Sequence, residues 1–399
     1  MPHINLIAMI TFDNTSLAFH DKHTGYLKRA RWLFRLIANP TLVKLGSAFI
    51  RLAILVGIPV KWALKPTVFS HFCGGETIDQ CDEVINKLGM SNIKTILDYS
   101  AEGKQTESDL DYTASQVLAT IKKSKTNSNI PYAVFKPSGV ARVTLLENIQ
   151  EGKTLSKEEI MEYERVQGRF RMICQTAFEL GVPVMVDAEE SWIQRVVDEI
   201  TEAMMFSFNK VKPIVFTTLQ LYRTDRIDYL QDIFIRSRQK GIYPGVKLVR
   251  GAYMEKERER ALRLGYKSPI YPNKPATDKA FDEAVAFCLD HVDEMAVCIG
   301  THNELSCALA AGKIISMGIE RAHPNISFSQ LLGMSDNISY QLAADEFRVT
   351  KYVPFGLVKT VVPYLIRRAE ENTSVAGQTS KELLLIETEL KRRKSQKAE

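Results

Sequence analysis

Two neighbouring arginines near the C-terminal end of the sequence carry the clearest chemical signal. Arg367 and Arg368 are adjacent, and Glu371 follows four and three residues later. On a helix these spacings bring side chains to one face, so all three can reach one end of a pocket. Paired guanidiniums bind a carboxylate with a bidentate geometry that lysine cannot reproduce. The pattern predicts an anionic substrate, and an exposed helix with ordinary ion pairs is the alternative.

Polar side chains also follow most of the short apolar runs of the chain. If these runs are strands, their polar ends can gather around one small molecule. A histidine such as His302 can bind a metal ion together with a nearby thiol. The nearest upstream thiol, Cys298, would lie roughly 13 Å away along a strand, which is too far for both to bind one ion. We therefore expect no metal site. The polar residues are Asp98, Lys136, Asp187, Gln220, Arg250, Tyr253, Thr301, His302, Asn303 and Gln330.

The elements that must position these residues are eight apolar, β-branched runs with longer amphipathic stretches between them. Parallel strands need helical crossovers, so this alternation predicts an α/β fold, a distorted (β/α)8 TIM-type barrel with an N-terminal helical cap. No G-x-G-x-x-G motif occurs, which disfavours a doubly wound nucleotide-binding sheet. The expected strands are 68–73, 94–99, 132–136, 183–187, 213–219, 245–249, 295–301 and 325–331.

Three parts are expected along the chain: a helical cap over 1–66, the barrel over 67–376, and a C-terminal helix with a basic tail over 377–399. Apolar residues recur at helical spacing within 26–65, with basic residues between them. The longest uncharged run of this region, 52–60, is far shorter than the roughly 20 residues that span a membrane. The N-terminus does not resemble a secretory signal.

The overall composition is that of a folded globular protein, with 45% hydrophobic and 25% charged residues among 399. The 52 basic and 47 acidic side chains are too evenly balanced to indicate nucleic acid as a partner, although the net charge of +5 slightly favours an anionic surface. Six scattered cysteines without a C-x-x-C pair indicate reduced thiols. We expect a cytoplasmic protein without disulfides.

Nine short motifs resemble those of proline dehydrogenases in order and spacing. The resemblance covers about 70–375 and is closest to the single-function form with the Lys-Leu-Val-Arg-Gly-Ala-Tyr motif, with no aldehyde dehydrogenase domain following it. The motifs are FCGGE (72–76), LDYS (97–100), FKP (135–137), VDAEE (186–190), KLVRGAY (247–253), THN (301–303), QLLGM (330–334), YVP (352–354) and YLIRR (364–368).

The resemblance implies an oxidoreductase that oxidises L-proline to Δ1-pyrroline-5-carboxylate, the first step of proline catabolism to glutamate, with FAD as the cofactor. Arg367 and Arg368 would bind the proline carboxylate, and Glu371 would hold one guanidinium. Lys136 and Asp187 would form an ion pair at the pocket floor. The side chains of Leu248, Tyr253 and Tyr352 would pack against the proline ring. Because Tyr352 is large, proline is favoured over 4-hydroxyproline.

The same resemblance implies which residues bind FAD. A phosphate needs positive charge and close backbone approach, and Arg250, Gly251 and Ala252 offer both. Lys247 stands where many bacterial relatives have arginine, so charge is kept but the planar geometry is lost, which affects the flavin potential. The implied FAD residues are Asp187, Gln220, Lys247, Val249, Arg250, Gly251, Ala252, Thr301, His302, Asn303, Gln330, Arg368 and Glu371.

Further implications concern the partners. Reduced flavin would pass its electrons to a membrane quinone, with peripheral contact on the inner face of the membrane. Three alternatives stay open: a 4-hydroxyproline dehydrogenase, a Schiff-base aldolase using Lys136 or Lys247, and a membrane-surface scaffold built on 28–65 and the basic tail. The polar residues at the strand ends disfavour the membrane-surface scaffold, because a scaffold does not require polar side chains that converge on one place.

Overall fold

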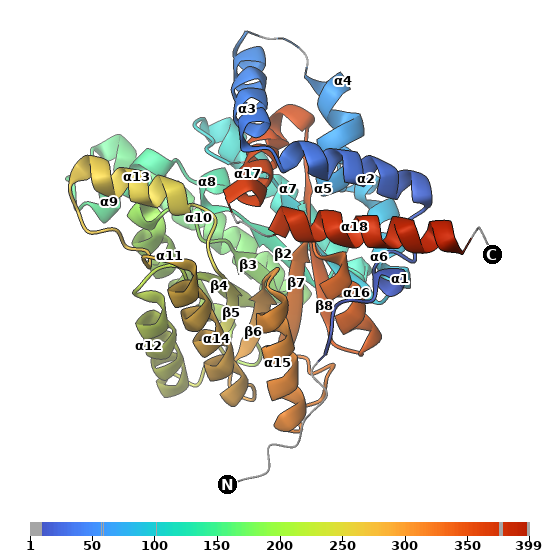
Figure 1. The fold of residues 1–399 in the computed structure, drawn as a ribbon. Coiled ribbons are helices and arrows are strands. Elements are labelled where there is room, and N and C mark those ends of the chain that lie inside the picture. The colour runs from blue at the N-terminus through green and yellow to red at the C-terminus, as the bar shows by residue number, and fades with distance from the viewer. Residues whose placement is uncertain (1–9, 57, 59, 101, 375–377, 397–399) are drawn as a thin grey trace.

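The computed structural model is a closed barrel of eight parallel strands with helices around it (Figure 1). It describes residues 10–56, 58, 60–100, 102–374 and 378–396, without the side chains at 51, 54 and 370–380. Each strand pairs with its neighbour in the sequence, and β1 closes the barrel against β8. The strands are β1 (Ile93–Tyr99), β2 (Tyr132–Phe135), β3 (Val184–Val186), β4 (Val215–Gln220), β5 (Gly245–Val249), β6 (Ala296–Gly300), β7 (Ile326–Leu331) and β8 (Val349–Phe355).

The (β/α)8 barrel is therefore confirmed, and seven of its expected strands are present, but the first expected strand is wrong. Residues 68–73 instead belong to a π-helical turn, η1 (Lys65–Phe69), and a short helix, α5 (Ser70–Phe72). The eighth strand of the barrel is instead β8 (Val349–Phe355), a segment that was expected to follow the last strand, 325–331, without being a strand itself. A short apolar run does not distinguish strand from helix, and Phe69 and Phe72 here bury their rings against helices of the cap.

Alternation along the strands fixes which side chains reach the barrel interior. Ile96, Val134 and Met185 belong to the interior cluster, together with Tyr132, Phe216, Ala296, Cys298 and Tyr352. Two residues further along β1, β2 and β3, the next inward positions are polar: Asp98, Lys136 and Asp187. The same two-residue alternation therefore places apolar side chains in the barrel interior and charged side chains at its C-terminal mouth.

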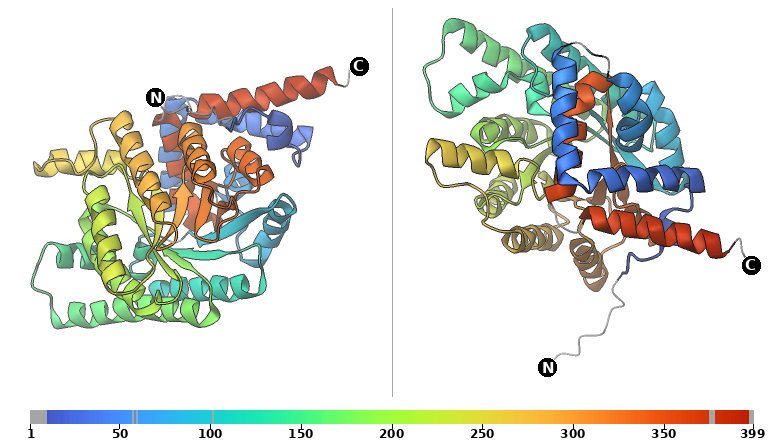
Figure 2. Two further views of the ribbon diagram at one scale, coloured as in Figure 1. Left: turned by 90° about the horizontal axis from the view of Figure 1, so that it is seen from below. Right: turned by 45° about the horizontal axis from the view of Figure 1, so that its top comes forward.

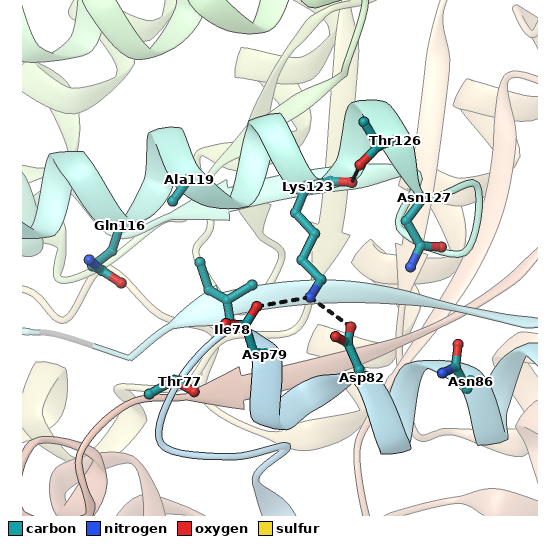
Figure 3. Close-up of a pocket in the computed structure, with 10 residues that line it drawn as sticks. All are labelled: Thr77, Ile78, Asp79, Asp82, Asn86, Gln116, Ala119, Lys123, Thr126 and Asn127. Atoms are coloured by element: carbon teal, nitrogen blue, oxygen red, sulfur yellow. Dashed lines mark hydrogen bonds and ion pairs between the residues drawn. The ribbon is translucent and has the colours of Figure 1, made fainter.

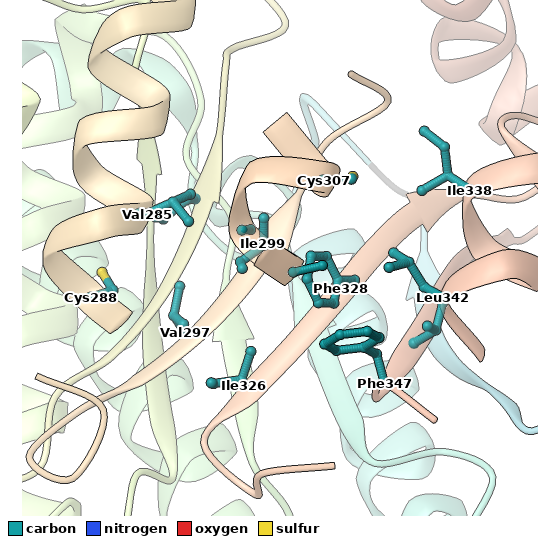
Figure 4. Packing of buried hydrophobic residues seen from close by; sticks show 14 of the residues in the cluster. Val285, Cys288, Val297, Ile299, Cys307, Ile326, Phe328, Ile338, Leu342 and Phe347 are labelled. Carbon is teal, nitrogen blue, oxygen red and sulfur yellow. The ribbon is translucent and has the colours of Figure 1, made fainter. Parts of the chain in front are cut away.

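The outer helices cover the barrel through a second apolar layer, part of which is shown in Figure 4. Phe328 of β7 meets Phe347 edge to face, with 5.6 Å between ring centroids. All six cysteines are buried and free. The helices between and after the strands are α7 (Glu107–Thr126), α8 (Pro137–Val140), α9 (Val143–Gln150), α10 (Lys157–Leu180), α11 (Ser191–Phe208), α12 (Arg226–Gln239), α13 (Met254–Leu264), α14 (Lys274–Asp290), α15 (Glu304–Ser316), α16 (Asp336–Ala344) and α17 (Val358–Ser374).

Local sequence signals set the ends of these helices. In α10, Ser156 accepts a hydrogen bond from the backbone N–H of Glu159, whose side chain accepts one from the backbone N–H of Ser156. This capping box satisfies two backbone donors that the first turn leaves open. Gly181 ends the helix with φ of 68°, a left-handed conformation that glycine adopts without strain.

The N-terminal helices and the last helix form one layer beside the barrel. In Figure 2, α2 and α18 lie side by side although they are far apart in the sequence. A cluster containing Leu27, Phe34, Val361 and Ile386 joins them to α17. The elements before the barrel and after α17 are α1 (Thr15–Ala18), α2 (Thr24–Ile37), α3 (Pro40–Leu55), α4 (Lys61–Leu64), η2 (Asp79–Cys81), α6 (Asp82–Met90) and α18 (Gln378–Ser395).

The expected domain division stays a prediction, and its boundary at 376 falls on residues 375–377, outside the described part of the chain. Among the described residues no single helix is both long and apolar enough to cross a membrane. The bent pair Thr24–Ile37 and Pro40–Ile50, with 92° between its halves, meets the length and composition requirements only when the halves are taken together.

Candidate active site

A hydrogen-bonded cluster around Tyr352 occupies the C-terminal mouth of the barrel. The hydroxyl of Tyr352 donates to Asp187 Oδ2 at 2.8 Å and accepts from Lys136 Nζ at 3.0 Å. Lys136 Nζ also lies 2.7 Å from Asp98 Oδ2 and 3.5 Å from Asp187 Oδ2. Lys247 donates to the other oxygen of Asp187. The expected Lys136–Asp187 contact is present, but Asp98 is the nearer partner of Lys136.

The protonation states of this cluster follow from its charges. Burial opposes the ionised form of Asp187, but Lys247 and Lys136 outweigh burial and lower the pKa of this carboxyl. Burial also opposes the charge of Lys136, yet Asp98, Asp187 and Glu102 together raise its pKa. Burial raises the pKa of Tyr352 well above its ordinary value, so its hydroxyl keeps a proton to donate. The cluster holds fixed charges in a place from which water is largely excluded.

Arg367 reaches the rim of the mouth from α17. Its terminal nitrogens Nη1 and Nη2 lie 2.6 and 2.5 Å from the two carboxylate oxygens of Glu102, in the loop after β1. The guanidinium also lies 5.7 Å from the ring centroid of Tyr253, which is buried. Glu102 in turn lies 4.0 Å from Lys136 Nζ. Arg367 is thus connected to the central cluster through a carboxylate.

Sequence reasoning missed Glu102, because the stretch 101–128 is rich in polar and charged residues, which are typical of an exposed helix with loops. The available signal was its position four residues after Asp98, at the end of a predicted strand. Glu371, which was expected to hold a guanidinium, has a side chain outside the described part of the structure.

Arg368 lies on the β6 side of the mouth. It is buried, and its guanidinium carbon lies 5.3 Å from the ring centroid of Tyr364. Burial lowers the pKa of His302 to about 3, and the charges of Lys351, Arg368 and Arg250 add to this effect. His302 is therefore neutral, and its Nδ1 lies 2.9 Å from Ser335 Oγ. The charge of Arg368 therefore acts on His302 after β6, whereas Arg367 pairs with Glu102 after β1.

The ends of β4 and β5 form a second part of the mouth. Gln220 bridges neighbouring strand ends, donating to Glu189 O at 2.6 Å and accepting from Ala252 N at 3.3 Å. Gly251 has φ of 132°, and a Cβ there would lie 2.5 Å from the Tyr222 ring. Only glycine is accommodated in this backbone conformation. The backbone after β5 is thus held close to its neighbours.

Arg250 follows β5 and is anchored by three protein groups. Its Nε, Nη1 and Nη2 donate to Asp278, Thr301 and Ser306 at 2.7, 2.6 and 2.8 Å. A guanidinium has five N–H donors, so two remain for an anion. Asn303 caps α15, accepting from Ser306 N at 3.1 Å. These contacts fix a basic side chain next to the glycine of the β5 loop.

Two expected site residues turn away from the mouth. Leu248, expected to contact the substrate, is fully buried in the cluster between the barrel and its outer helices, because the inward residue of β5 is Lys247. Gln330, expected to line the cofactor, donates to Thr301 O at 3.0 Å and accepts from Ser339 of α16 at 2.9 Å. Both side chains point toward the outer helices, since neighbouring strand residues face opposite sides, and their contacts with substrate and cofactor stay predictions.

Glu189 is a further buried group that sequence reasoning did not single out. Its carboxyl accepts from the backbone N–H of Ser138 at 2.7 Å and from its hydroxyl at 2.6 Å. Burial, reinforced by Glu190 and Glu102, raises the pKa of Glu189 to about 8. Glu189 is therefore mainly protonated at neutral pH and adds little negative charge to the mouth.

No group of three or more His, Cys, Asp or Glu side chains within the described residues is arranged to hold a metal ion. An open groove of about 760 Å³ lies elsewhere, on the outer surface between α6 and α7 (Figure 3). Lys123 crosses it to Asp82 at 2.7 Å and Asp79 at 3.5 Å. The groove is lined by the C-terminal part of α7, which leads to the opposite end of the barrel from the polar mouth.

Comparison with known proteins gives a consistent result. A family model described as proline dehydrogenase matches residues 81–381. Proline dehydrogenase 1, mitochondrial, of Dictyostelium discoideum is 31% identical over 95% of this chain and 74% of its own length. Hydroxyproline dehydrogenase of Xenopus laevis is 29% identical over 94% of this chain and 88% of its own length.

A solved structure shares the fold. Proline utilization A (PutA) from Bdellovibrio bacteriovorus, in a form inactivated by N-propargylglycine, superimposes with a TM-score of 0.72 at 17% identity. The match covers 90% of this chain and 38% of that chain.

Proposed function

Because the chain belongs to the proline dehydrogenase family, we propose that this enzyme, which acts on proline, oxidises L-proline to Δ1-pyrroline-5-carboxylate, the first step of proline catabolism to glutamate. FAD, when bound, supplies the hydride acceptor that side chains cannot provide. A hydride leaves the ring carbon next to nitrogen, the nitrogen loses a proton, and a C=N double bond forms.

One observation carries this proposal: Arg367 reaches the rim of the mouth and already binds a carboxylate there, that of Glu102. Guanidiniums are suited to bind the carboxylate of an amino acid in the same way. Glu189 adds little negative charge to the mouth, since burial raises its pKa to about 8. An amino acid whose amine is neutral, as hydride removal requires, carries the single negative charge that such a guanidinium binds.

Arg367 and Arg368 bind and orient the substrate carboxylate in this proposal. Arg367 is already held by Glu102, so its guanidinium is positioned before a ligand arrives and loses little side-chain entropy on binding. Lys136, 4.0 Å from Glu102, extends the positive field toward the barrel interior. Positioning and electrostatics are the contribution of these side chains.

Tyr352 and Tyr253 would contact the apolar part of the proline ring. Tyr352 is fixed by its bonds to Asp187 and Lys136, so its ring cannot easily move aside for a 4-hydroxyl group. This supports proline over 4-hydroxyproline. The relatives include the hydroxyproline dehydrogenase of Xenopus laevis, so 4-hydroxyproline stays the alternative substrate.

The residues at the β4–β6 ends fit a flavin with a pyrophosphate. Gly251 holds the backbone after β5 against the Tyr222 ring, and Arg250 beside it has two N–H groups left to bind an anion. Lys247 and Gln220 would lie by the flavin ring system, with Asp187 and Arg368 close to it. Val249 and Ala252 would contribute along the β5 end, and Thr301, His302 and Asn303 from the β6 end.

The onward path of the electrons is a further part of the proposal. Reduced FAD would pass them to a membrane quinone, from a cytoplasmic enzyme in peripheral contact with the inner face of the membrane. A Schiff-base aldolase is disfavoured, because such chemistry needs a neutral lysine. Lys136 is instead paired with Asp98 and Asp187, and Lys247 is paired with Asp187.

Steady-state kinetics with a soluble dye as the electron acceptor test the substrate assignment. We expect a higher kcat/KM for L-proline than for trans-4-hydroxy-L-proline. The reverse preference would favour the hydroxyproline alternative, and no oxidation of either compound by the FAD-loaded protein would refute both.

A further inference from the structure

An apolar stripe on the outside of α3 is covered by no part of the described chain. Leu42, Leu45, Phe49 and Leu52 follow one another at spacings of three and four residues, which places them on one face of the helix, and Val56 follows directly after its last residue. Their exposed fractions are 49%, 65%, 66%, 57% and 60%. With Trp62 of α4, exposed to 76%, they form what we call the cap surface.

The stripe is not the face by which α3 packs on the protein. Val43, Ser47 and Ala53 are buried, and α3 contacts α17. A helix that buries one face in a soluble protein normally presents polar residues on the other. Here both faces are apolar, so the outer one is suited to a second apolar environment.

The segment 22–75, which carries the cap surface, has charged side chains of one sign. No acidic residue occurs between Asp21 and Glu76, whereas nine lysines and arginines lie within 22–75. Lys28, Arg29 and Lys44 are exposed. Lys61 and Lys65, which flank Trp62, are partly neutralised by Glu76 at 2.9 and 2.7 Å. The apolar stripe therefore lies within a basic surrounding.

We propose that the cap surface binds the interface of an anionic lipid bilayer, with α3 lying along the membrane plane. Apolar side chains would enter the acyl region, basic side chains would contact anionic headgroups, and Trp62 would lie at the boundary that tryptophan prefers.

The bent pair of α2 and α3 lies on the membrane rather than across it. Its halves meet at 92°, and α2 buries Leu27 and Phe34 in the cluster shared with α18 and α17. Removing α2 from that cluster would expose a large apolar area of the protein. Only α3 and the start of α4 are therefore available for lipid.

Docking through the cap surface would bring the bilayer close to the active-site mouth. The helix α3 lies next to α17, which carries Arg367 and Arg368, and the two helices are in contact (Figure 1). The use of this arrangement for electron transfer to a quinone rests on the proposed function. Lipid binding itself needs neither proline nor flavin.

The test is co-sedimentation of the full chain with vesicles of phosphatidylcholine, alone or mixed with phosphatidylglycerol. The cap variant is Leu45→Ser/Phe49→Ser/Leu52→Ser. The matched control is Met90→Ser/Val211→Ser/Leu262→Ser, whose three side chains are 82%, 83% and 86% exposed in other regions. We expect wild type and control to bind the mixed vesicles, and the cap variant to lose roughly 30-fold or more in partitioning.

Three results would overturn the proposal. The first is absence of wild-type binding to mixed vesicles, and the second is equal binding by the cap variant. The third is self-association of wild type, abolished in the cap variant without vesicle binding, which would make the surface a contact between copies of this chain. Proline oxidation with a soluble dye separates the two proposals, because it is expected to be unchanged in the cap variant whichever way the vesicle experiment ends.

Discussion

The guanidinium of Arg367 holds both carboxylate oxygens of Glu102, at 2.6 and 2.5 Å. This ion pair joins α17 to the loop after β1 at the rim of the barrel. A substrate carboxylate that binds Arg367 must therefore share the guanidinium with Glu102 or displace it. The site therefore binds a substrate carboxylate either beside that of Glu102 or in its place.

Arg368→Met tests the carboxylate clamp. The substitution keeps much of the side-chain volume and removes the charge, so we expect KM for L-proline to rise by roughly 10- to 100-fold. Arg263→Met, at an exposed position of α13, is the control and leaves KM unchanged. Steady-state kinetics with a soluble dye give both values, and an unchanged KM in Arg368→Met would contradict the clamp.

Tyr352→Ser tests the substrate choice. The serine is too short to fill the space of the phenol, so 4-hydroxyproline gains room while proline loses a contact surface. We expect the ratio of kcat/KM for 4-hydroxyproline over proline to rise about 10-fold or more. A ratio equal to that of the wild type would show that Tyr352 does not determine this choice.

Lys136→Met tests the electrostatics of the barrel interior. Asp98 and Asp187 lie 2.7 and 3.5 Å from the ammonium group, and its loss leaves two buried carboxylates without that charge. We expect the free energy of unfolding to fall by about 3–5 kcal/mol. Denaturant unfolding measures the loss, and Lys136→Met/Asp98→Asn should recover part of it. A double variant no more stable than Lys136→Met would argue against the Asp98 pairing.

Glu189→Gln tests the protonated carboxyl near the mouth. Burial raises the pKa of Glu189 from 4.5 to about 8, so between these values the folded state holds a proton that the unfolded state has lost. This group makes stability fall as pH rises through that range, by at most about 1.4 kcal/mol per pH unit. Glutamine mimics the protonated form. Unfolding at several pH values should show a smaller decline for the variant, and parallel curves would contradict the raised pKa.

The fold and the central charges could be predicted from the sequence because both depend on periodicity. Apolar runs at intervals suited to crossover helices predicted seven strands correctly. Asp98, Lys136 and Asp187 could be predicted as site residues because they lie at the ends of such runs. Arg367 was found because adjacent arginines are suited to bind a carboxylate.

The errors came from features that local sequence does not determine. Residues 68–73 are apolar enough for a strand, and only packing against α2 and α17 makes them helical. Strand alternation turns Leu248 and Gln330 toward the outer helices, an orientation that their motifs alone do not reveal. Glu102 is brought to Arg367 by barrel closure, a contact between residues 265 positions apart.

The central claim is that this barrel transfers a hydride from proline to FAD, and an anaerobic titration tests it most directly. FAD-loaded protein is mixed with increasing L-proline while the visible flavin absorbance is recorded. The account predicts bleaching that saturates with proline, together with one equivalent of Δ1-pyrroline-5-carboxylate per flavin reduced. Flavin that stays oxidised at saturating proline, or protein that binds no flavin, would contradict it.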